Sequence, residues 1–210
     1  SNAKANLCRI WQPEERKWKE SSLPADMRDG LRFGIVEGKT VAVSTFRPGL
    51  LKAWVFENGA WKSQQSLNTG IDPVTASGGV RLCDIDGDGT CELFDASRIH
   101  RFVDGSWKVL PFGLPEGTAI ETAAGDDAGL RFADIDDDGR QDVIFSNAER
   151  FGTWMFESME KGWTRGGLQG ERTTEGVGKD HPRSRDELAP IVRADGSNNG
   201  AWIKRGHIYW

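Results

Sequence analysis

The chain has 210 residues, enough to bury a substantial core in one or two domains. Its net charge of −5 gives no reason to expect nucleic acid or an anionic membrane as a partner, and no apolar run is long enough to cross a bilayer. With 26 glycines, 9 tryptophans and no strong periodic helical runs, the composition is typical of an all-β protein with many turns.

The N-terminus and the cysteines limit what else can be inferred. Ser1-Asn2-Ala3 has the form of a scar left by tag cleavage, so we interpret residues 4–210 as a single domain. Three cysteines are too few for a disulfide framework. Cys83 and Cys91 flank an acidic loop, and either a disulfide across a hairpin or two free thiols fits the sequence.

A short pattern recurs along the chain: an apolar or aromatic triplet, a turn, and then tryptophan. Each complete copy predicts a β-hairpin with a short turn. The copies lie at 9–18 (within a leading hairpin, 7–20), 54–61, 101–107 and 154–163, and a fifth would begin at 207–210. Because eight of the nine tryptophans occupy equivalent hairpin positions, we expect them to pack between neighbouring repeats.

A second, acidic pattern lies in residues 80–94 and returns fifty residues later in residues 130–145. Each copy places carboxylates at loop positions 1, 3, 5 and 9, with a glycine at position 6 for the sharp turn. These residues are Asp84, Asp86, Asp88 and Glu92, then Asp134, Asp136, Asp138 and Asp142. Alternate residues of a tight loop can turn their oxygens toward one centre, and hard oxygen ligands in this number suit Ca²⁺.

Two other interpretations of these loops are weaker. In a polar turn that binds nothing, two carboxylates about 4 Å apart repel by roughly 4 kcal/mol at an effective dielectric constant near 20. An EF-hand needs Glu at position 12 and a helix on each side, but position 12 is Asp95 or Phe145 and the flanks favour strands. We therefore expect each loop to join two antiparallel strands.

Two segments resemble the acidic pattern without its full set of acids. Residues 30–34 match the start of the pattern but continue without the Asp series, which predicts a hairpin that has lost the metal. Residues 191–200 place Asp195, Ser197 and Asn199 where three Asp would stand. These neutral ligands make a third Ca²⁺ site doubtful, and a hydrogen-bonded Asx-type turn is the preferred interpretation.

Together the patterns define four units that start near residues 30, 79, 129 and 190, each with four strands in about 50 residues. This period predicts a β-propeller of four-stranded antiparallel blades, with about four blades. The chain is either a small closed ring completed by the leading hairpin or part of a larger propeller. Residues 170–189 lengthen the third repeat and predict a surface loop, in which Lys179, His181, Arg183 and Arg185 are contact candidates.

The series Asp-x-Asp-x-Asp-Gly-x-x-Asp/Glu between strands, repeated at a blade-length period, resembles FG-GAP/VCBS-type repeats, which build propellers such as the head of integrin α-subunits. The resemblance implies Ca²⁺ bound by the eight acids and by the carbonyl groups of Thr90 and Arg140 at position 7. More loosely, the chain resembles a propeller module of large secreted bacterial proteins. This implies a secreted, periplasmic or cell-surface location.

Two classes of function fit this sequence. The favoured one is a non-catalytic, Ca²⁺-stabilised module that binds a protein, a glycan or another ligand. The alternative is a carbohydrate-binding or enzymatic propeller with its site in the central funnel. The three histidines, His100, His181 and His207, show no ligand spacing, and the sequence contains no catalytic triad, phosphate-loop or zinc-protease motif, so no catalytic residue is predicted.

Overall fold

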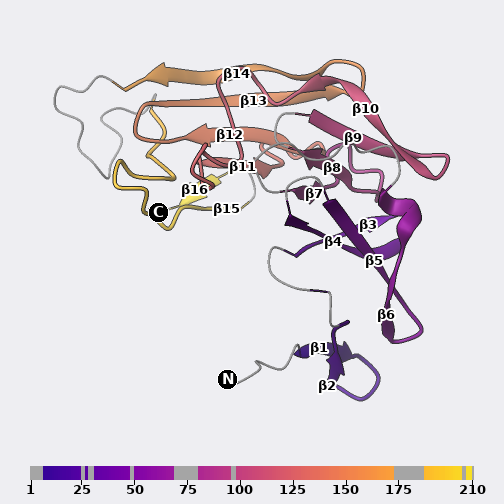
Figure 1. Cartoon of the computed structure of the whole chain (residues 1–210). Coiled ribbons are helices and arrows are strands. Elements are labelled where there is room, and N and C mark those ends of the chain that lie inside the picture. Colours follow the sequence, from indigo (N-terminus) through magenta and orange to yellow (C-terminus); the bar gives the residue numbers. More distant parts are fainter. Residues whose placement is uncertain are drawn as a thin grey trace.

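The computed structural model describes residues 7–24, 27, 31–47, 50–68, 80–95, 98–172, 187–204 and 207–209. In this part of the chain the regular elements are β-strands, apart from one 3₁₀ turn, η1 (Gln65–Asn68), and all strand pairs are antiparallel (Figure 1). The predicted all-β class is confirmed.

Three four-stranded sheets follow one another, and in each the strands pair in chain order. The first contains β3 (Arg32–Val36), β4 (Lys39–Arg47), β5 (Leu50–Glu57) and β6 (Ala60–Ser63). The second contains β7 (Arg81–Cys83), β8 (Glu92–Asp95), β9 (Arg98–Val103) and β10 (Ser106–Gly113). The third contains β11 (Leu130–Ala133), β12 (Asp142–Ser146), β13 (Arg150–Ser158) and β14 (Gly162–Glu171).

Two shorter sheets lie at the two ends of the described chain. The N-terminal hairpin pairs β1 (Leu7–Gln12) with β2 (Lys17–Ser22), and the C-terminal hairpin pairs β15 (Trp202–Lys204) with β16 (His207–Tyr209). Among the described residues the two hairpins are separate sheets, and no strand pairing joins them to each other or to a four-stranded sheet. The candidate contact residues of the long insertion lie outside the described residues.

The short hairpins form because their turns carry residues that tolerate positive φ. Glu37-Gly38, Asn58-Gly59 and Asp104-Gly105 all have both φ angles between 50° and 78°. Positive φ at both central residues is the type I′ turn, whose twist matches that of the flanking strands. The hairpins predicted around residues 58 and 104 are confirmed by the pairing of β5 with β6 and of β9 with β10.

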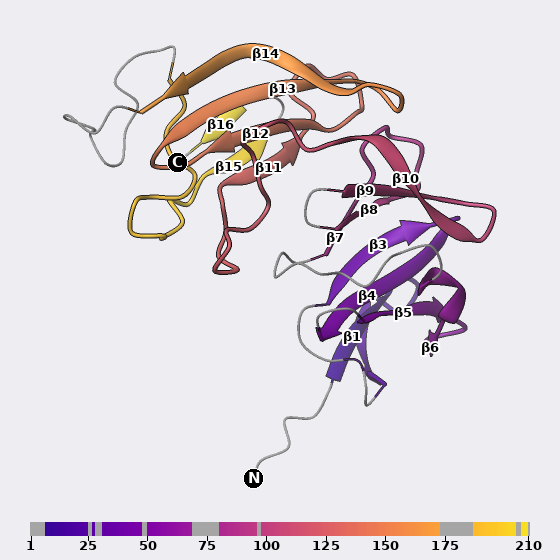
Figure 2. The ribbon, with the colours of Figure 1, turned by 45° about the horizontal axis from the view of Figure 1, so that its top comes forward.

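A single sheet would expose an apolar face to water. Neighbouring sheets remove that apolar surface from water by packing against each other. One cluster joins the first and second sheets through Val41, Val55 and Leu93, and another joins the second and third through Phe94 and Phe156. In Figures 1 and 2 the first strands β3, β7 and β11 lie toward one another, while β6, β10 and β14 lie at the periphery.

A repeated hydrogen bond fixes each sheet to the next. The Cys91 N–H donates to the Ile35 carbonyl oxygen over 2.6 Å, and the Gln141 N–H donates to the Ile85 carbonyl oxygen over 2.9 Å. In both bonds the donor is the last residue before the second strand of one sheet. The acceptor in the sheet before is Ile35, the last but one residue of β3, in the first bond, and Ile85, two residues after β7, in the second. A backbone hydrogen bond donated just before the second strand therefore links the second sheet to the first and the third sheet to the second.

The tryptophan side chains differ in where they pack and in how exposed they are. Trp107 packs in the cluster between the first and second sheets, and Trp163 packs among Phe94 and Phe132 between the second and third. In contrast, the side chains of both hairpin ends are exposed, with Trp11, Trp18 and Trp202 at 44%, 62% and 53%. Trp54 and Trp61 of the first sheet pack with Met27 and Ala42 in a separate cluster. The packing expected between repeats therefore holds for Trp107 and Trp163, and not for these two or for the terminal hairpins.

In the described chain no helix has the length and apolar character needed to span a membrane. All three cysteines are free thiols. Cys83 and Cys91 therefore follow the second of the two interpretations left open by the sequence.

Candidate metal centres

The first acidic loop connects β7 to β8, as expected for a loop between antiparallel strands. Both carboxylate oxygens of Asp84 accept loop N–H groups, Oδ1 from Gly87 and Oδ2 from Gly89, each over 2.9 Å. Gly87 and Gly89 have φ angles of 74° and 87°, a region that glycine adopts without steric cost. The loop therefore wraps around the Asp84 side chain.

The next two acids turn toward the same centre. One carboxylate oxygen each from Asp84, Asp86 and Asp88 lies within 4.8 Å of the others, a spacing that can hold a metal ion. Thr90, at position 7, donates its N–H to Asp88 Oδ1 over 2.7 Å. The remaining oxygens of Asp86 and Asp88 accept hydrogen bonds from the guanidinium of Arg101 on β9, the first over 3.0 Å.

Arg101 is a functional residue that sequence reasoning did not identify. It lies 15 residues beyond Asp86, and only the fold of β9 back over the loop brings the two side chains together. Its charge offsets part of the repulsion among the loop acids. One guanidinium stands against four carboxyl groups, so the loop keeps a negative excess.

Glu92, at position 9, is fully buried. Its Oε2 accepts the Ile85 N–H over 3.1 Å, while its Oε1 has no hydrogen-bond partner among the described residues. Burial raises the pKa of the Glu92 carboxyl to about 8, the Ile85 N–H opposes this rise, and the charge of Asp86 adds to it. The acids whose oxygens converge within 4.8 Å are Asp84, Asp86 and Asp88, and Glu92 is not among them. A buried oxygen without a hydrogen-bond partner is costly.

The second loop connects β11 to β12 along the same backbone path. Asp134 accepts the N–H groups of Asp138 and Gly139 over 3.0 and 2.9 Å, and its side chain forms a second triad with Asp136 and Asp138. Asp137 takes the place of Gly87 with a φ angle of 60°, and Gly139 has 87°. Both copies of the repeated pattern thus wrap around the carboxylate of their first Asp.

The second loop differs at positions 7 and 9. Asp142 is buried, and both its oxygens are satisfied by backbone N–H groups, Oδ2 by Ile135 and Oδ1 by Phe156, each over 2.8 Å. Burial raises the pKa of Asp142, and these two bonds oppose the rise. The side chain of Arg140 pairs with Asp138 and donates to the Glu157 carbonyl oxygen over 2.8 Å. Asp142 therefore leaves no unpaired oxygen comparable to that of Glu92.

The two loops lie against each other. The Ile85 carbonyl oxygen accepts the Gln141 N–H, so the first loop is bonded to the end of the second. A Cβ atom placed on Gly87 would lie only 2.6 Å from the carbonyl oxygen of Gly139, so that position has room for glycine alone. A change in one loop is therefore felt by the other.

The third set of candidate residues lies elsewhere in the repeat. Asp195, Ser197 and Asn199 belong to the turn before β15 and not to a connection between paired strands. Asp195 Oδ1 accepts the Ser197 N–H over 3.0 Å, which is the Asx-type turn that the sequence favoured. Asn199 is bound to the Pro190 carbonyl oxygen over 2.9 Å and to Arg193.

That turn repeats an earlier one in the chain. The bonds Arg193 N–H to Ser197 O and Asn199 N–H to Ile191 O match Thr122 N–H to Asp126 O and Ala128 N–H to Ile120 O, in the turn before β11. The structural fourth unit accordingly begins at β15, about ten residues after the start inferred from sequence. The residues around Asp195-Gly196 resemble those of a metal loop, but the segment does not connect two strands of one sheet.

The two Asp triads supply only oxygen atoms, which bind hard divalent cations and provide no nucleophile or general base of unusual character. His100 is buried beside Asp95 and His207 is exposed on β16, on different sheets. The oxygens gathered in these loops are therefore of the kind that can hold a hard divalent cation. No protein-family model matches the chain, and no curated protein matches it in sequence.

Proposed function

We propose that the protein is a non-catalytic interaction module of a secreted, periplasmic or cell-surface protein, built as a small β-propeller and stabilised by Ca²⁺ in its two acidic loops. The observation that carries this proposal is the buried Glu92 Oε1, at position 9 of the loop that holds the first Asp triad, which has no hydrogen-bond partner among the described residues. A divalent cation would offset the charge of the acids, and the unpartnered oxygen would coordinate it.

The donor set favours Ca²⁺ over other metals. Both triads consist of carboxylates alone, with neither thiolate nor imidazole, so the soft and borderline transition metals lack the ligands they prefer. Ca²⁺ accepts six to eight oxygens in flexible geometry, and the acids, the position 7 carbonyl groups and water would provide them. In the first loop the ligands would be Asp84, Asp86, Asp88, Thr90 and Glu92. In the second they would be Asp134, Asp136, Asp138 and Arg140, with Asp142 bracing the loop.

The propeller is the finer part of the proposal, and the repeated contacts between sheets support it. The first and second sheets each accept one backbone hydrogen bond from the sheet that follows, at Ile35 and at Ile85. Three complete sheets would become four if the two terminal hairpins joined into one, because β15–β16 and β1–β2 have two strands each. The hairpins would then cover the aromatic side chains that they now expose.

The test is a calorimetric titration of the Ca²⁺-free protein with CaCl₂, compared with titrations of Asp86→Ala and Asp126→Ala. Wild type is expected to bind two ions per chain, and Asp86→Ala to lose one of them. Asp126 is an exposed acid outside both loops, so its variant serves as the matched control and should bind like wild type. A flat titration of the wild type at millimolar Ca²⁺, or equal loss in both variants, would remove the basis of the proposal.

A further inference from the structure

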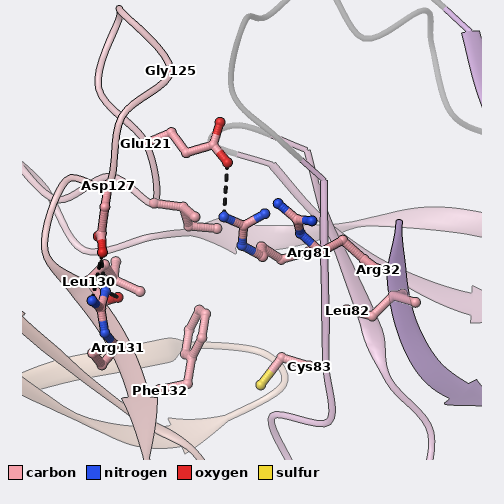
Figure 3. A pocket seen from close by; sticks show the side chains of 11 residues that line it. Arg32, Arg81, Leu82, Cys83, Glu121, Gly125, Asp127, Leu130, Arg131 and Phe132 are labelled. Atoms are coloured by element: carbon pink, nitrogen blue, oxygen red, sulfur yellow. Dashed lines mark hydrogen bonds and ion pairs between the residues drawn. The ribbon is translucent and has the colours of Figure 1, made fainter. Parts of the chain in front are cut away.

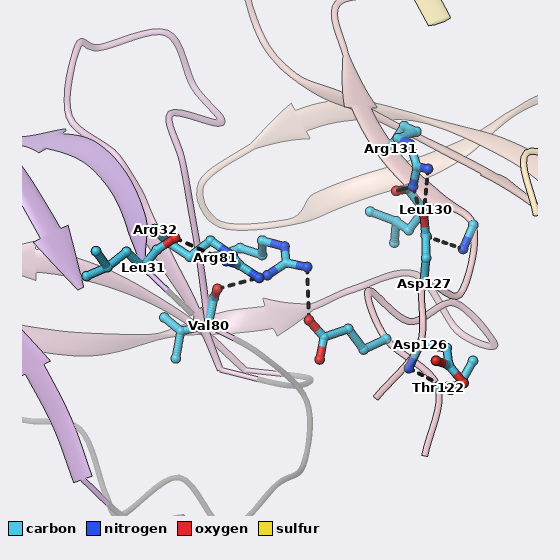
Figure 4. Close-up of polar contacts among 11 residues, drawn as sticks. Leu31, Arg32, Val80, Arg81, Thr122, Asp126, Asp127, Leu130 and Arg131 are labelled. Atoms are coloured by element: carbon cyan, nitrogen blue, oxygen red, sulfur yellow. Dashed lines mark hydrogen bonds and ion pairs between the residues drawn. The ribbon is translucent and has the colours of Figure 1, made fainter. Parts of the chain in front are cut away.

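The first strands of the three complete sheets carry arginines held in the same way. The Nη1 atoms of Arg32, Arg81 and Arg131 donate to the carbonyl oxygen of the residue directly before each, over 3.1, 3.2 and 2.7 Å (Figure 4). One local hydrogen bond, repeated three times, thus fixes the direction of three guanidinium groups. The repeat brings positive charge to the side where the first strands meet.

These arginines line a single cavity of about 510 Å³. Small-molecule sites typically enclose about 300–1,000 Å³. Apolar side chains complete the wall, among them Leu82, Ile120 and Phe132, and Figure 3 shows the Arg32 and Arg81 guanidinium groups near one another in the cavity. The cavity thus joins an apolar surface to a fixed group of hydrogen-bond donors.

The charges in the cavity wall are not balanced. Arg81 pairs with Glu121 over 2.9 Å, and Arg131 pairs with Asp127 through two bonds of 3.0 and 2.6 Å. Arg32 forms no ion pair with a carboxylate in the described part of the chain, and its guanidinium donates to the Leu31 carbonyl oxygen. Burial, followed by the charge of Arg81, lowers the pKa of Arg32, while the charge of Glu121 opposes this. Among the described residues that line the cavity, three arginines therefore stand beside two carboxylates.

We propose that this cavity is a binding site for a small organic carboxylate, whose oxygens are held by Arg32 and Arg81 and whose apolar body lies against Leu82, Ile120 and Phe132. The planar guanidinium fork matches a carboxylate with two parallel hydrogen bonds. A carboxylate here also neutralises the excess positive charge and separates the like charges of Arg32 and Arg81. The site is independent of the two metal loops, because none of their proposed ligands lines it.

The test measures binding of benzoate and hexanoate to the full chain by ligand-observed NMR and calorimetry, beside the neutral benzamide and hexanamide and inorganic sulfate. At least one carboxylate is expected to bind in the millimolar range or tighter, as suits a ligand of so few atoms. Its amide should bind at least about tenfold more weakly, since it lacks the charge-assisted bonds. Sulfate binding as tightly as the carboxylate would show an adventitious ion only and overturn the proposal.

Three variants make the result specific. Arg32→Gln should weaken carboxylate binding by about tenfold or more, whereas Arg9→Gln, at an exposed surface pair with Glu20, should leave it unchanged. Glu121→Gln should tighten binding, because it releases Arg81, and a gain of affinity cannot arise from misfolding. Absence of binding for both carboxylates, or equal affinity in wild type and Arg32→Gln, would overturn the proposal. The measurements are repeated in EDTA, so that this outcome is separate from the fate of the Ca²⁺ proposal.

Discussion

Glu92 has an ionisation that depends on whether a cation is present. Without metal, the buried carboxyl holds its proton up to a pKa of about 8, while in the unfolded chain it loses it near 4.5. The folded state then binds more protons over this interval, so its stability is greatest at low pH and declines as the pH rises from about 4.5 to about 8. With Ca²⁺ bound, the ionised form is the ligand and the penalty is offset.

This predicts a reversal on replacing the acid by its neutral isostere. In EDTA, Glu92→Gln removes a decline of at most about 1.4 kcal/mol per pH unit, so the variant should be more stable than wild type at pH 8 and the difference should shrink toward pH 5. In saturating Ca²⁺ wild type should be the more stable protein at pH 8. Urea unfolding at several pH values measures both, and parallel pH profiles for the two proteins in EDTA would contradict the prediction.

At the same scale, the sequence identified Glu92 by position but gave no sign that one of its oxygens is buried without a donor. That property depends on the length of the side chain relative to Asp142, which reaches two backbone N–H groups at the same position of the second loop. The contact of Arg101 with the loop acids could not be predicted from the sequence for a related reason. A single basic residue on a strand pairs with these acids only once the strand has folded over them.

At the scale of the element, the contact between the two loops depends on one missing side chain. Gly59→Ala and Gly87→Ala carry a similar backbone cost, because the φ angles are 78° and 74° and the left-handed region costs a residue with a Cβ atom roughly 1–2 kcal/mol. Only Gly87 also meets an obstacle, since its added Cβ would lie 2.6 Å from Gly139 O, whereas nothing lies within 4 Å at Gly59.

We therefore expect Gly87→Ala to lower the free energy of unfolding by about 1–3 kcal/mol more than Gly59→Ala, in the range found for overpacked sites. It should also weaken Ca²⁺ binding in both loops, because Gly139 has to move. Denaturant melts of the two variants and a titration with CaCl₂ check this. Equal losses of stability in the two variants would show that the loops do not press on each other at this point.

Elements that follow from local chemistry could be predicted from sequence. The Asp series at alternate positions and the Asn-Gly and Asp-Gly turns each specify a short backbone path, and the loops and hairpins formed where those residues stand. The fourth unit could not be located in this way, because Asp195-Gly196-Ser197 carries the same turn chemistry as a metal loop. Only the pairing of β15 with β16 distinguishes the two.

At the scale of the whole molecule, the two terminal hairpins decide whether the series of sheets closes. If β1–β2 completes a fourth blade with β15–β16, removing residues 1–22 exposes both a sheet edge and the apolar face of the neighbouring sheet. The melting temperature should then fall by several degrees, about 2–4 °C for each kcal/mol lost in a chain of this size. Removal of residues 1–6 alone is the matched control, and identical melting of both truncated proteins would count against closure.

The repeated bond between a loop N–H and the isoleucine carbonyl of the preceding sheet has a mechanical consequence. When the chain is stretched by its two termini, the contacts between neighbouring sheets bear the force, because each sheet contacts chiefly its neighbours. The sheets should part singly at comparable force, and each released unit of roughly 50 residues would lengthen the chain by about 170 Å. Such a molecule extends under tension in discrete steps, with one sheet unfolding at a time while the others remain folded.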